Sequence, residues 1–165
     1  MKRFAAGFMM LLAGCASFDG RGLVPEQSTA QDVAALMGTP ADRITVSGGD
    51  TIWYYPRAPM GMHTFAVRMS SAGVLRSIDQ LLTEQNLRNL VAGVTTGSQV
   101  REVLGPPWRT TRTDRMQRDV WEYSMLNSAQ WPFYLYVQLS YDGIVREVLL
   151  LKDYSKEPGG DGAKP

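Results

Sequence analysis

Two segments of the chain show the alternation of apolar and polar residues that is typical of a half-buried β-strand. Residues 65–70 have apolar side chains at every second position, and residues 133–139 repeat the pattern with larger apolar groups. Each segment leads into a glycine-containing turn, at 71–73 and 141–143, and then into a short apolar run. The pattern therefore predicts an antiparallel hairpin in each half of the chain.

A short helix is predicted before each of these strand regions. In residues 29–40 and 96–107 a threonine comes first, a polar residue follows three positions later, and apolar residues then occupy positions i, i+3 and i+4. That order is typical of a capping box followed by one apolar helix face. Both segments end with glycine and proline, which indicates the end of a helix. A further helix is predicted over residues 83–91. The corresponding segment in the first half of the chain does not have a helical pattern.

The two halves match along most of their length, which indicates an internal repeat. Ile52-Trp-Tyr-Tyr corresponds to Val120-Trp-Glu-Tyr, and Gly73-Val-Leu corresponds to Gly143-Ile-Val. We therefore predict an α+β fold of two tandem repeats, each a helix followed by a three-stranded antiparallel sheet. The first repeat is assigned to residues 28–80 and the second to residues 81–154.

The beginning of the chain is typical of an export signal. Two basic residues precede an apolar run that is too short to span a bilayer and ends at Cys15. Residues 12–15 resemble a bacterial lipobox, which implies a signal peptide over 1–14 and a lipid on Cys15. The resemblance also implies sorting to the outer membrane, since no aspartate follows Cys15. The alternative is a buried helix ending at a core cysteine. Residues 15–27 are predicted as a tether and 155–165 as a disordered tail.

Composition excludes several classes of function. The 165 residues include 17 basic and 16 acidic side chains, one cysteine and one histidine. A single cysteine excludes an internal disulfide and a cysteine-rich zinc site, and one histidine excludes a histidine-rich metal site. The near-neutral charge argues against nucleic-acid binding. His63 has no carboxylate beside it, so we expect no enzyme, no cofactor and no metal.

The ordered motifs resemble the SmpA/OmlA family of outer-membrane lipoproteins, also called BamE-like. They are a threonine-led turn, Leu/Met-Gly-x-Pro, Trp-x-Tyr, an alternating strand and Gly-Val/Ile-aliphatic, and they occur twice. The tandem arrangement looks more like beta-lactamase inhibitory protein. The resemblance implies a non-catalytic scaffold that faces the periplasm and supports outer-membrane protein assembly, by the beta-barrel assembly machine, or envelope integrity. The alternative is an inhibitor-like binder that uses a two-repeat sheet against a periplasmic enzyme.

Aromatic residues in the second repeat are the first candidates for partner binding. Trp131 lies in a predicted loop, and Tyr134 and Tyr136 lie on the outward face of the predicted strand. Trp131 could instead fold back over an apolar edge, and the helix between the repeats could cover the two tyrosines. Trp53 and Trp121 occupy matching strand positions and are predicted to belong to the core.

Basic residues before Trp121 are candidates for contact with anionic lipid or lipopolysaccharide phosphate. They recur at every third position as Arg109, Arg112, Arg115 and Arg118, and the alternative is a solvated loop. In the first repeat, the family resemblance implies that Tyr55, Arg57 and Met60 contact phospholipid or partner proteins.

Overall fold

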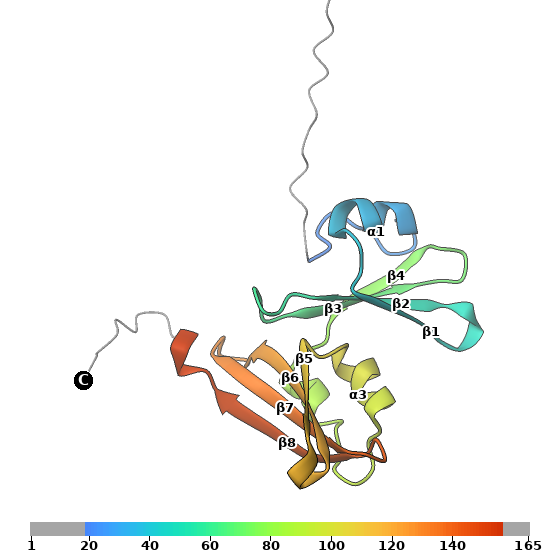
Figure 1. The fold of residues 1–165 in the computed structure, drawn as a ribbon. Coiled ribbons are helices and arrows are strands. Elements are labelled where there is room, and N and C mark those ends of the chain that lie inside the picture. The colour runs from blue at the N-terminus through green and yellow to red at the C-terminus, as the bar shows by residue number, and fades with distance from the viewer. Residues whose placement is uncertain (1–18, 157–165) are drawn as a thin grey trace, which may run out of the picture.

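The computed structural model describes residues 19–156, which form two four-stranded antiparallel sheets with short helices (Figure 1). The first repeat contains α1 (Ala30–Met37), β1 (Asp42–Thr45), β2 (Thr51–Pro56), β3 (Thr64–Met69) and β4 (Leu75–Gln80). The second contains α2 (Glu84–Leu87), α3 (Gly97–Leu104), β5 (Arg109–Thr113), β6 (Arg118–Leu126), β7 (Pro132–Ser140) and β8 (Val145–Lys152). Single 3-10 turns occur at η1 (Ser47–Gly49), η2 (Asp114–Met116) and η3 (Tyr154–Lys156). In each sheet the strands pair in chain order.

The predicted helix starts are confirmed. The Thr29 side chain accepts a hydrogen bond from the Asp32 backbone N–H, and the Asp32 carboxylate accepts one from the Thr29 N–H at 2.8 Å. Thr96 and Gln99 form the same capping box at α3. Because each box satisfies backbone donors that the helix leaves unpaired, local sequence alone fixes where these helices begin.

The predicted fold class, α+β with helix–three-strand repeats, is wrong. The described residues are mainly β, and each sheet gains a fourth strand, β1 or β5. β1 pairs with β2 through Arg43 opposite Trp53, and β5 pairs with β6 through Thr110 opposite Trp121. Both are short, polar edge strands, so neither has the alternating apolar pattern that reveals a strand. These two strands form because their backbones hydrogen-bond to a neighbouring strand. Tertiary structure determines which strand that neighbour is.

Each repeat has its own core between a helix and one face of its sheet. In the first, α1 packs on the sheet through Val33 and Met37, and the buried Trp53 confirms its predicted core position. In the second, α3 packs through Val100 and Leu104, and Leu87 and Leu90 join the same cluster. The remaining buried core residues are Tyr55, Val67, Met69 and Leu75 in the first repeat and Leu82, Tyr123, Met125, Leu135, Val137, Leu139 and Val145 in the second.

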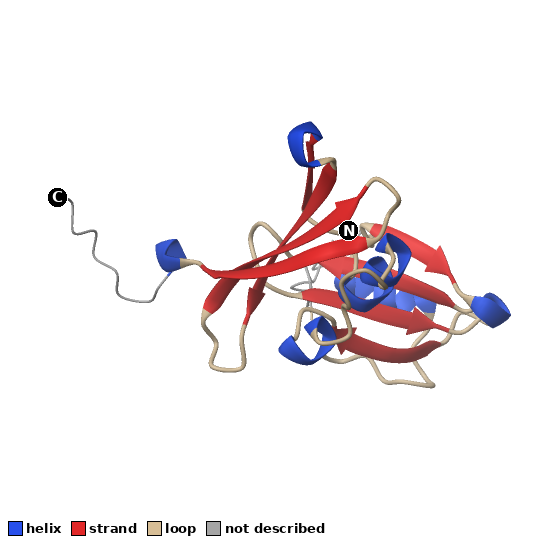
Figure 2. Ribbon diagram, turned by 90° about the horizontal axis from the view of Figure 1, so that it is seen from below, coloured by secondary structure: helices blue, strands red, loops and turns tan. Residues whose placement is uncertain are grey.

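The second face of the first sheet is also buried, because the end of α3 lies against it. Figure 1 shows this sheet between α1 and α3, and Figure 2 shows the two sheets from below. Tyr54 and Ala66 are 0% and 1% exposed on this face. A Cβ built on Gly105 would lie 2.7 Å from Cγ2 of Thr64, so the α3 end is in tight contact with β3. The two repeats therefore stack instead of forming one continuous sheet.

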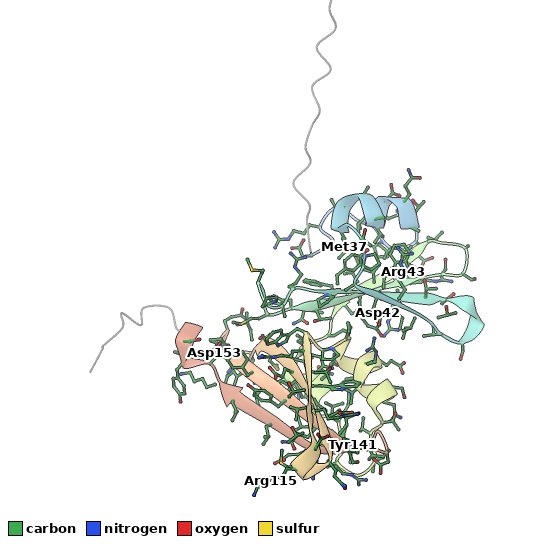
Figure 3. All side chains as sticks on the ribbon, viewed as in Figure 1. Met37, Asp42, Arg43, Arg115, Tyr141 and Asp153 are labelled. Atoms are coloured by element: carbon green, nitrogen blue, oxygen red, sulfur yellow. The ribbon has the colours of Figure 1, made fainter. Side chains whose placement is uncertain are left out.

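An ion pair joins the repeats beside this contact. The Arg101 guanidinium on α3 donates to the Asp42 carboxylate on β1, and both side chains are partly exposed. Figure 3 shows Asp42 on the side of the first sheet that faces the second repeat. A salt bridge of this exposure contributes little stability, at most about 1 kcal/mol, so buried apolar contact holds the stack and the ion pair helps to orient it.

The segment before α1 also packs on the first sheet. The Glu26 backbone N–H donates to the Leu75 carbonyl at 2.8 Å, and the Leu75 N–H donates to the Ser28 carbonyl at 2.8 Å. Leu23 packs against the first core. The part of the predicted tether that the structure describes therefore covers the beginning of β4.

Candidate functional site

The face of the second sheet that corresponds to the buried stacking face of the first is partly exposed along β7 and β8, whereas Glu122 and Ser124 of β6 on the same face are 8% and 3% exposed. The strand registers set the equivalence: Tyr54 and Ala66 are paired across β2 and β3, as Glu122 and Tyr136 are across β6 and β7. Ala66 is 1% exposed, whereas Tyr136 is only partly buried. The contrast is stronger one strand further on: Leu81 is 4% exposed and its counterpart Leu151 is 53% exposed.

This open face carries large apolar and aromatic side chains. Tyr134 lies opposite Leu151 and Tyr136 opposite Leu149, so the four side chains share one face of β7 and β8. The two tyrosine rings are tilted, with centroids 6.4 Å apart. We call Tyr134, Tyr136, Leu149 and Leu151 the open face. Exposed apolar surface of this kind is typical of a protein-binding site.

Tyr134 lies near the buried Asp153 at one end of the open face. A hydrogen bond with the Asp153 carboxylate raises the pKa of Tyr134, and burial adds to that effect. Asp153 itself is 4% exposed and its backbone N–H donates to the Pro132 carbonyl at 2.9 Å.

The other side of the open face has a polar rim. Arg109 and Glu122 form a salt bridge at 2.9 Å, and Arg118 donates to the Gln138 side chain at 3.3 Å. Helix α2 does not cover the tyrosines, since its Leu87 packs into the core on the opposite side of the sheet. An apolar centre with a polar rim is the usual composition of a protein interface.

Trp131 lies at a corner next to this surface. Its side chain is 42% exposed, and the Lys152 ammonium nitrogen lies 4.0 Å from its ring centroid and 4.9 Å from that of Tyr154. Tyr154 is 74% exposed. The lysine between two exposed rings makes an amphipathic corner, and the anchor role of Trp131 stays a prediction.

The four candidate arginines do not gather into one patch. Arg109 pairs with Glu122 and Arg118 bonds Gln138 on the open-face side, whereas Arg112 pairs with Asp119 at 2.9 Å on the core side. The Arg112 hydrogen bond holds the pKa of Asp119 below its usual range. Figure 3 shows Arg115 at the tip of the β5–β6 hairpin, near Tyr141. Contact with anionic lipid stays a prediction.

The candidates in the first repeat lie in different environments. Tyr55 is 4% exposed, and its hydroxyl donates to the Gly38 carbonyl at 3.1 Å, so it is a core residue and out of reach of a partner. Met60 is 96% exposed in the β2–β3 connection, where the Arg57 backbone N–H donates to the His63 carbonyl. Arg57 and Met60 thus remain surface residues. They belong to the first repeat, whereas the open face belongs to the second.

Several predictions concern residues or groups beyond this surface. The signal peptide and Cys15 lie outside the described residues. Within residues 19–156, no helix has the length and apolar character needed to cross a bilayer. Over the same range, no three residues among His, Cys, Asp and Glu are grouped as metal ligands would be. His63 stacks on Phe65, with ring centroids 5.9 Å apart.

The comparisons with known proteins correct the family assignment. No family model matches the chain, and no curated protein matches it. A search of solved structures found a DUF4309 family protein, YjgB, from Bacillus subtilis, with 20% sequence identity and a TM-score of 0.31. The match covers 81% of this chain and 84% of YjgB, and at that TM-score it supports no statement about fold or function. The resemblance to BamE-like proteins and to beta-lactamase inhibitory protein is wrong, because both sheets have four strands and no comparison returns either family.

Sequence reasoning found Tyr134 and Tyr136 but missed Leu149 and Leu151. The signal was present in the run Val148-Leu-Leu-Leu151, which has no polar residue at alternate positions. A strand with apolar residues on both faces is either buried on both or exposes one apolar face. Here α3 covers one face of the sheet, and Leu151 on the other face is 53% exposed.

Proposed function

We propose that this chain is a non-catalytic protein-binding module, tethered to the outer membrane by a lipid on Cys15, and that the open face of its second repeat binds the partner. The observation that carries the proposal is the difference between equivalent faces. In the first repeat this face is buried by the next repeat, whereas in the second it is partly exposed along β7 and β8, and two tyrosines stand where the first repeat has Thr64 and Ala66.

The substitutions on the open face favour a foreign partner over a third repeat stacked in the same way. Thr64 and Ala66 are small, and the end of α3 fits against Thr64. Their counterparts Tyr134 and Tyr136 fill that space, so an α3-like helix end would clash with the rings. Tyrosine buries a large area at low entropic cost and is enriched at the centres of protein interfaces.

The role in barrel assembly rested on the BamE-like resemblance and is not retained. The apolar surface, the polar rim and the predicted lipid anchor support an envelope binding protein whose partner is another protein of the same compartment. Tethering to the membrane surface would raise the local concentration of such a partner without adding contacts.

Site-specific photocrosslinking in native membranes tests the proposal. A photoreactive residue at Leu151 is expected to give one discrete adduct, and the same group at Ser71, on the exposed β3–β4 turn of the first repeat, is expected to give none. Tyr136→Arg should abolish the Leu151 adduct, because it places a charge at the centre of the apolar surface. Equal adducts at both positions, or an adduct that survives Tyr136→Arg, would rule out the open face as the site.

The anchor has its own test. Cys15→Ser should leave a precursor that is neither lipidated nor cleaved, whereas the unaltered chain should incorporate labelled palmitate and fractionate with the outer membrane. Labelling that persists in Cys15→Ser would show that the lipid lies elsewhere.

A further inference from the structure

A pocket of about 460 Å³ lies at the beginning of α3 in the second repeat. Its lining includes Trp121 and Asp119 of β6, the first turn of α3 and the β7–β8 turn that contains Tyr141. The volume is within the range of small-molecule sites, roughly 300–1,000 Å³. Trp121 packs against the second core, so the pocket is on the opposite side of the sheet from the open face. The proposed partner surface therefore does not account for it.

The polar and aromatic groups of this pocket differ from those at the same place in the first repeat. Two positions before its tryptophan, the first repeat has Thr51 and the second has Asp119, and both residues pair with the end of the next strand. The β3–β4 turn has Ser71 where the β7–β8 turn has Tyr141. A carboxylate and a second aromatic ring are thus features of the second repeat at this place.

The tryptophan of the first repeat is occupied by its own neighbours. The Trp53 indole N–H donates to the Thr51 hydroxyl at 3.1 Å. The Arg43 guanidinium lies over the ring, 4.0 Å from its centroid. Both the N–H donor and one ring face of Trp53 are therefore used within the fold, and the residue is 8% exposed.

The tryptophan of the second repeat lacks both contacts. Thr110 takes the strand position of the arginine that covers the first tryptophan, because it lies opposite Trp121. Asp119 bonds Arg112 through both of its oxygens, at 2.9 and 3.2 Å. Among residues 19–156, nothing accepts a hydrogen bond from the Trp121 N–H, and no cation lies over its ring. An aromatic face and a hydrogen-bond donor therefore remain available in the pocket.

The charged residues that line the pocket are matched in pairs. The three ion pairs are Arg112 with Asp119, Arg146 with Asp142 and Arg101 with Asp42. No lining charge is left over to attract a phosphate or a cation. A carboxylate offers about four acceptor positions and a guanidinium five donors, so the pairs still offer hydrogen bonds to a neutral ligand. Hydrogen bonds from Arg112 and Ser140 hold the pKa of Asp119 and Asp142 below the usual range, so both remain acceptors at neutral pH.

We propose that this pocket binds an uncharged sugar ring of a glycan, with an apolar C–H face of the sugar against Trp121 and its hydroxyls bonded to Asp119 and the Trp121 N–H. Each hydroxyl both donates and accepts, which suits a lining that offers a carboxylate beside an indole N–H. A wholly apolar ligand would leave these groups without partners. The Tyr141 ring is 49% exposed, and its hydroxyl donates to the Asp114 carboxylate at 2.9 Å, so it provides a second aromatic surface at the rim.

Nuclear magnetic resonance of the indole N–H groups tests the proposal in the full chain, in a detergent that carries no sugar. The probes are neutral trisaccharides of glucose, of mannose and of N-acetylglucosamine, which separate plain hexoses from the N-acetylated sugars of cell-wall glycan. At least one trisaccharide is expected to shift the Trp121 signal in a saturable manner. The Trp53 signal should stay in place, because its N–H is bonded within the fold.

Two variants give the pocket the residues of the first repeat, Asp119→Thr and Tyr141→Ser. Each introduces a residue that the equivalent strand or turn already accommodates, and an unchanged Trp53 signal shows that the variant is folded. Each should weaken sugar binding by about tenfold or more. Tyr154→Ser is the matched control, since it removes an exposed tyrosine that lies outside the pocket, and it should leave binding unchanged.

Three results would overturn the proposal. They are no shift of the Trp121 signal with any neutral trisaccharide, tighter binding of glucuronic acid, glucosamine or adenosine than of the best trisaccharide, and sugar binding that neither pocket variant weakens. None of these results bears on partner binding by the open face, which is read by the Leu151 adduct.

Discussion

Replacing Gly105 by alanine measures how strongly the stacking of the two repeats contributes to stability. Gly105 ends α3 at φ +78° and ψ −172°, a conformation that side-chain-bearing residues rarely adopt. The strain of an alanine there is expected to cost about 1–3 kcal/mol. The added Cβ would also lie 2.7 Å from Cγ2 of Thr64 and 3.3 Å from Cδ1 of Tyr54. Overpacking of that kind costs a further ~1–3 kcal/mol.

The first repeat offers a matched control at Gly38. It ends α1 at φ +82° and ψ −160°, and no atom lies within 4 Å of the position its Cβ would take. Both glycine carbonyls accept a tyrosine hydroxyl at 3.1 Å, from Tyr55 and Tyr123. Gly38→Ala should therefore cost the backbone strain alone, about 1–3 kcal/mol, and Gly105→Ala about 2–6 kcal/mol.

Urea unfolding followed by tryptophan fluorescence gives the free energy of unfolding of each variant. Thr64→Ser removes the methyl group that Cβ would meet, so it should recover stability in the Gly105→Ala background and recover none in Gly38→Ala. The double-mutant comparison isolates the contact from the strain. Equal losses at Gly38 and Gly105, with no recovery by Thr64→Ser, would refute the stacked arrangement of the repeats.

Two further predictions concern buried hydroxyls and the capping box. The Tyr54 hydroxyl is buried without a hydrogen-bond partner among the described residues, so Tyr54→Phe should raise the free energy of unfolding by about 1 kcal/mol. Tyr55→Phe should lower it by a similar amount, because it removes the hydrogen bond to the Gly38 carbonyl. A loss of stability in Tyr54→Phe would contradict this. Hydrogen bonds from Thr29 hold the pKa of Asp32 below its usual 3.8, so the capping box stabilises the fold above that pH and loses its effect as pH falls through the lower folded-state pKa. In thermal melts carried from neutral to acid pH, Asp32→Ala should show a shallower acid decline than the parent chain, and Gln99→Ala, which breaks the uncharged box, should lower stability at every pH without changing that slope.

Local signals accounted for the parts of the fold that are made by near neighbours. The capping boxes at Thr29 and Thr96 were readable because donor and acceptor are three residues apart. The turns after β3 and β7 could be predicted because each contains a glycine, Gly73 or Gly143. These glycines take φ of +75° and +78°, a conformation that other residues rarely adopt. The edge strands β1 and β5 could not be predicted, because a polar strand that pairs with a single neighbour shows no periodic apolar pattern.

The candidate site was predicted in part for the same reason. The alternation in β7 placed Tyr134 and Tyr136 on one face and the core residues on the other. Their exposure depended on which helix covered which face, and sequence left that open. Tyr55 shows the limit: a family motif suggested a surface contact, whereas the Gly38 carbonyl and the first core enclose it.

The sequence by itself determined a duplicated unit, its helix caps, its hairpin turns and the face on which each alternating strand buries its side chains, because those features depend on spacing along the chain. Tertiary structure decided what became of the opposite face. Ala66 and Tyr136 hold the same position in their repeats, yet one is buried and the other partly open. The reason is that stacking covers the first sheet on both faces and leaves one face of the second sheet partly exposed along β7 and β8, a consequence of chain order in space that no residue pattern encodes.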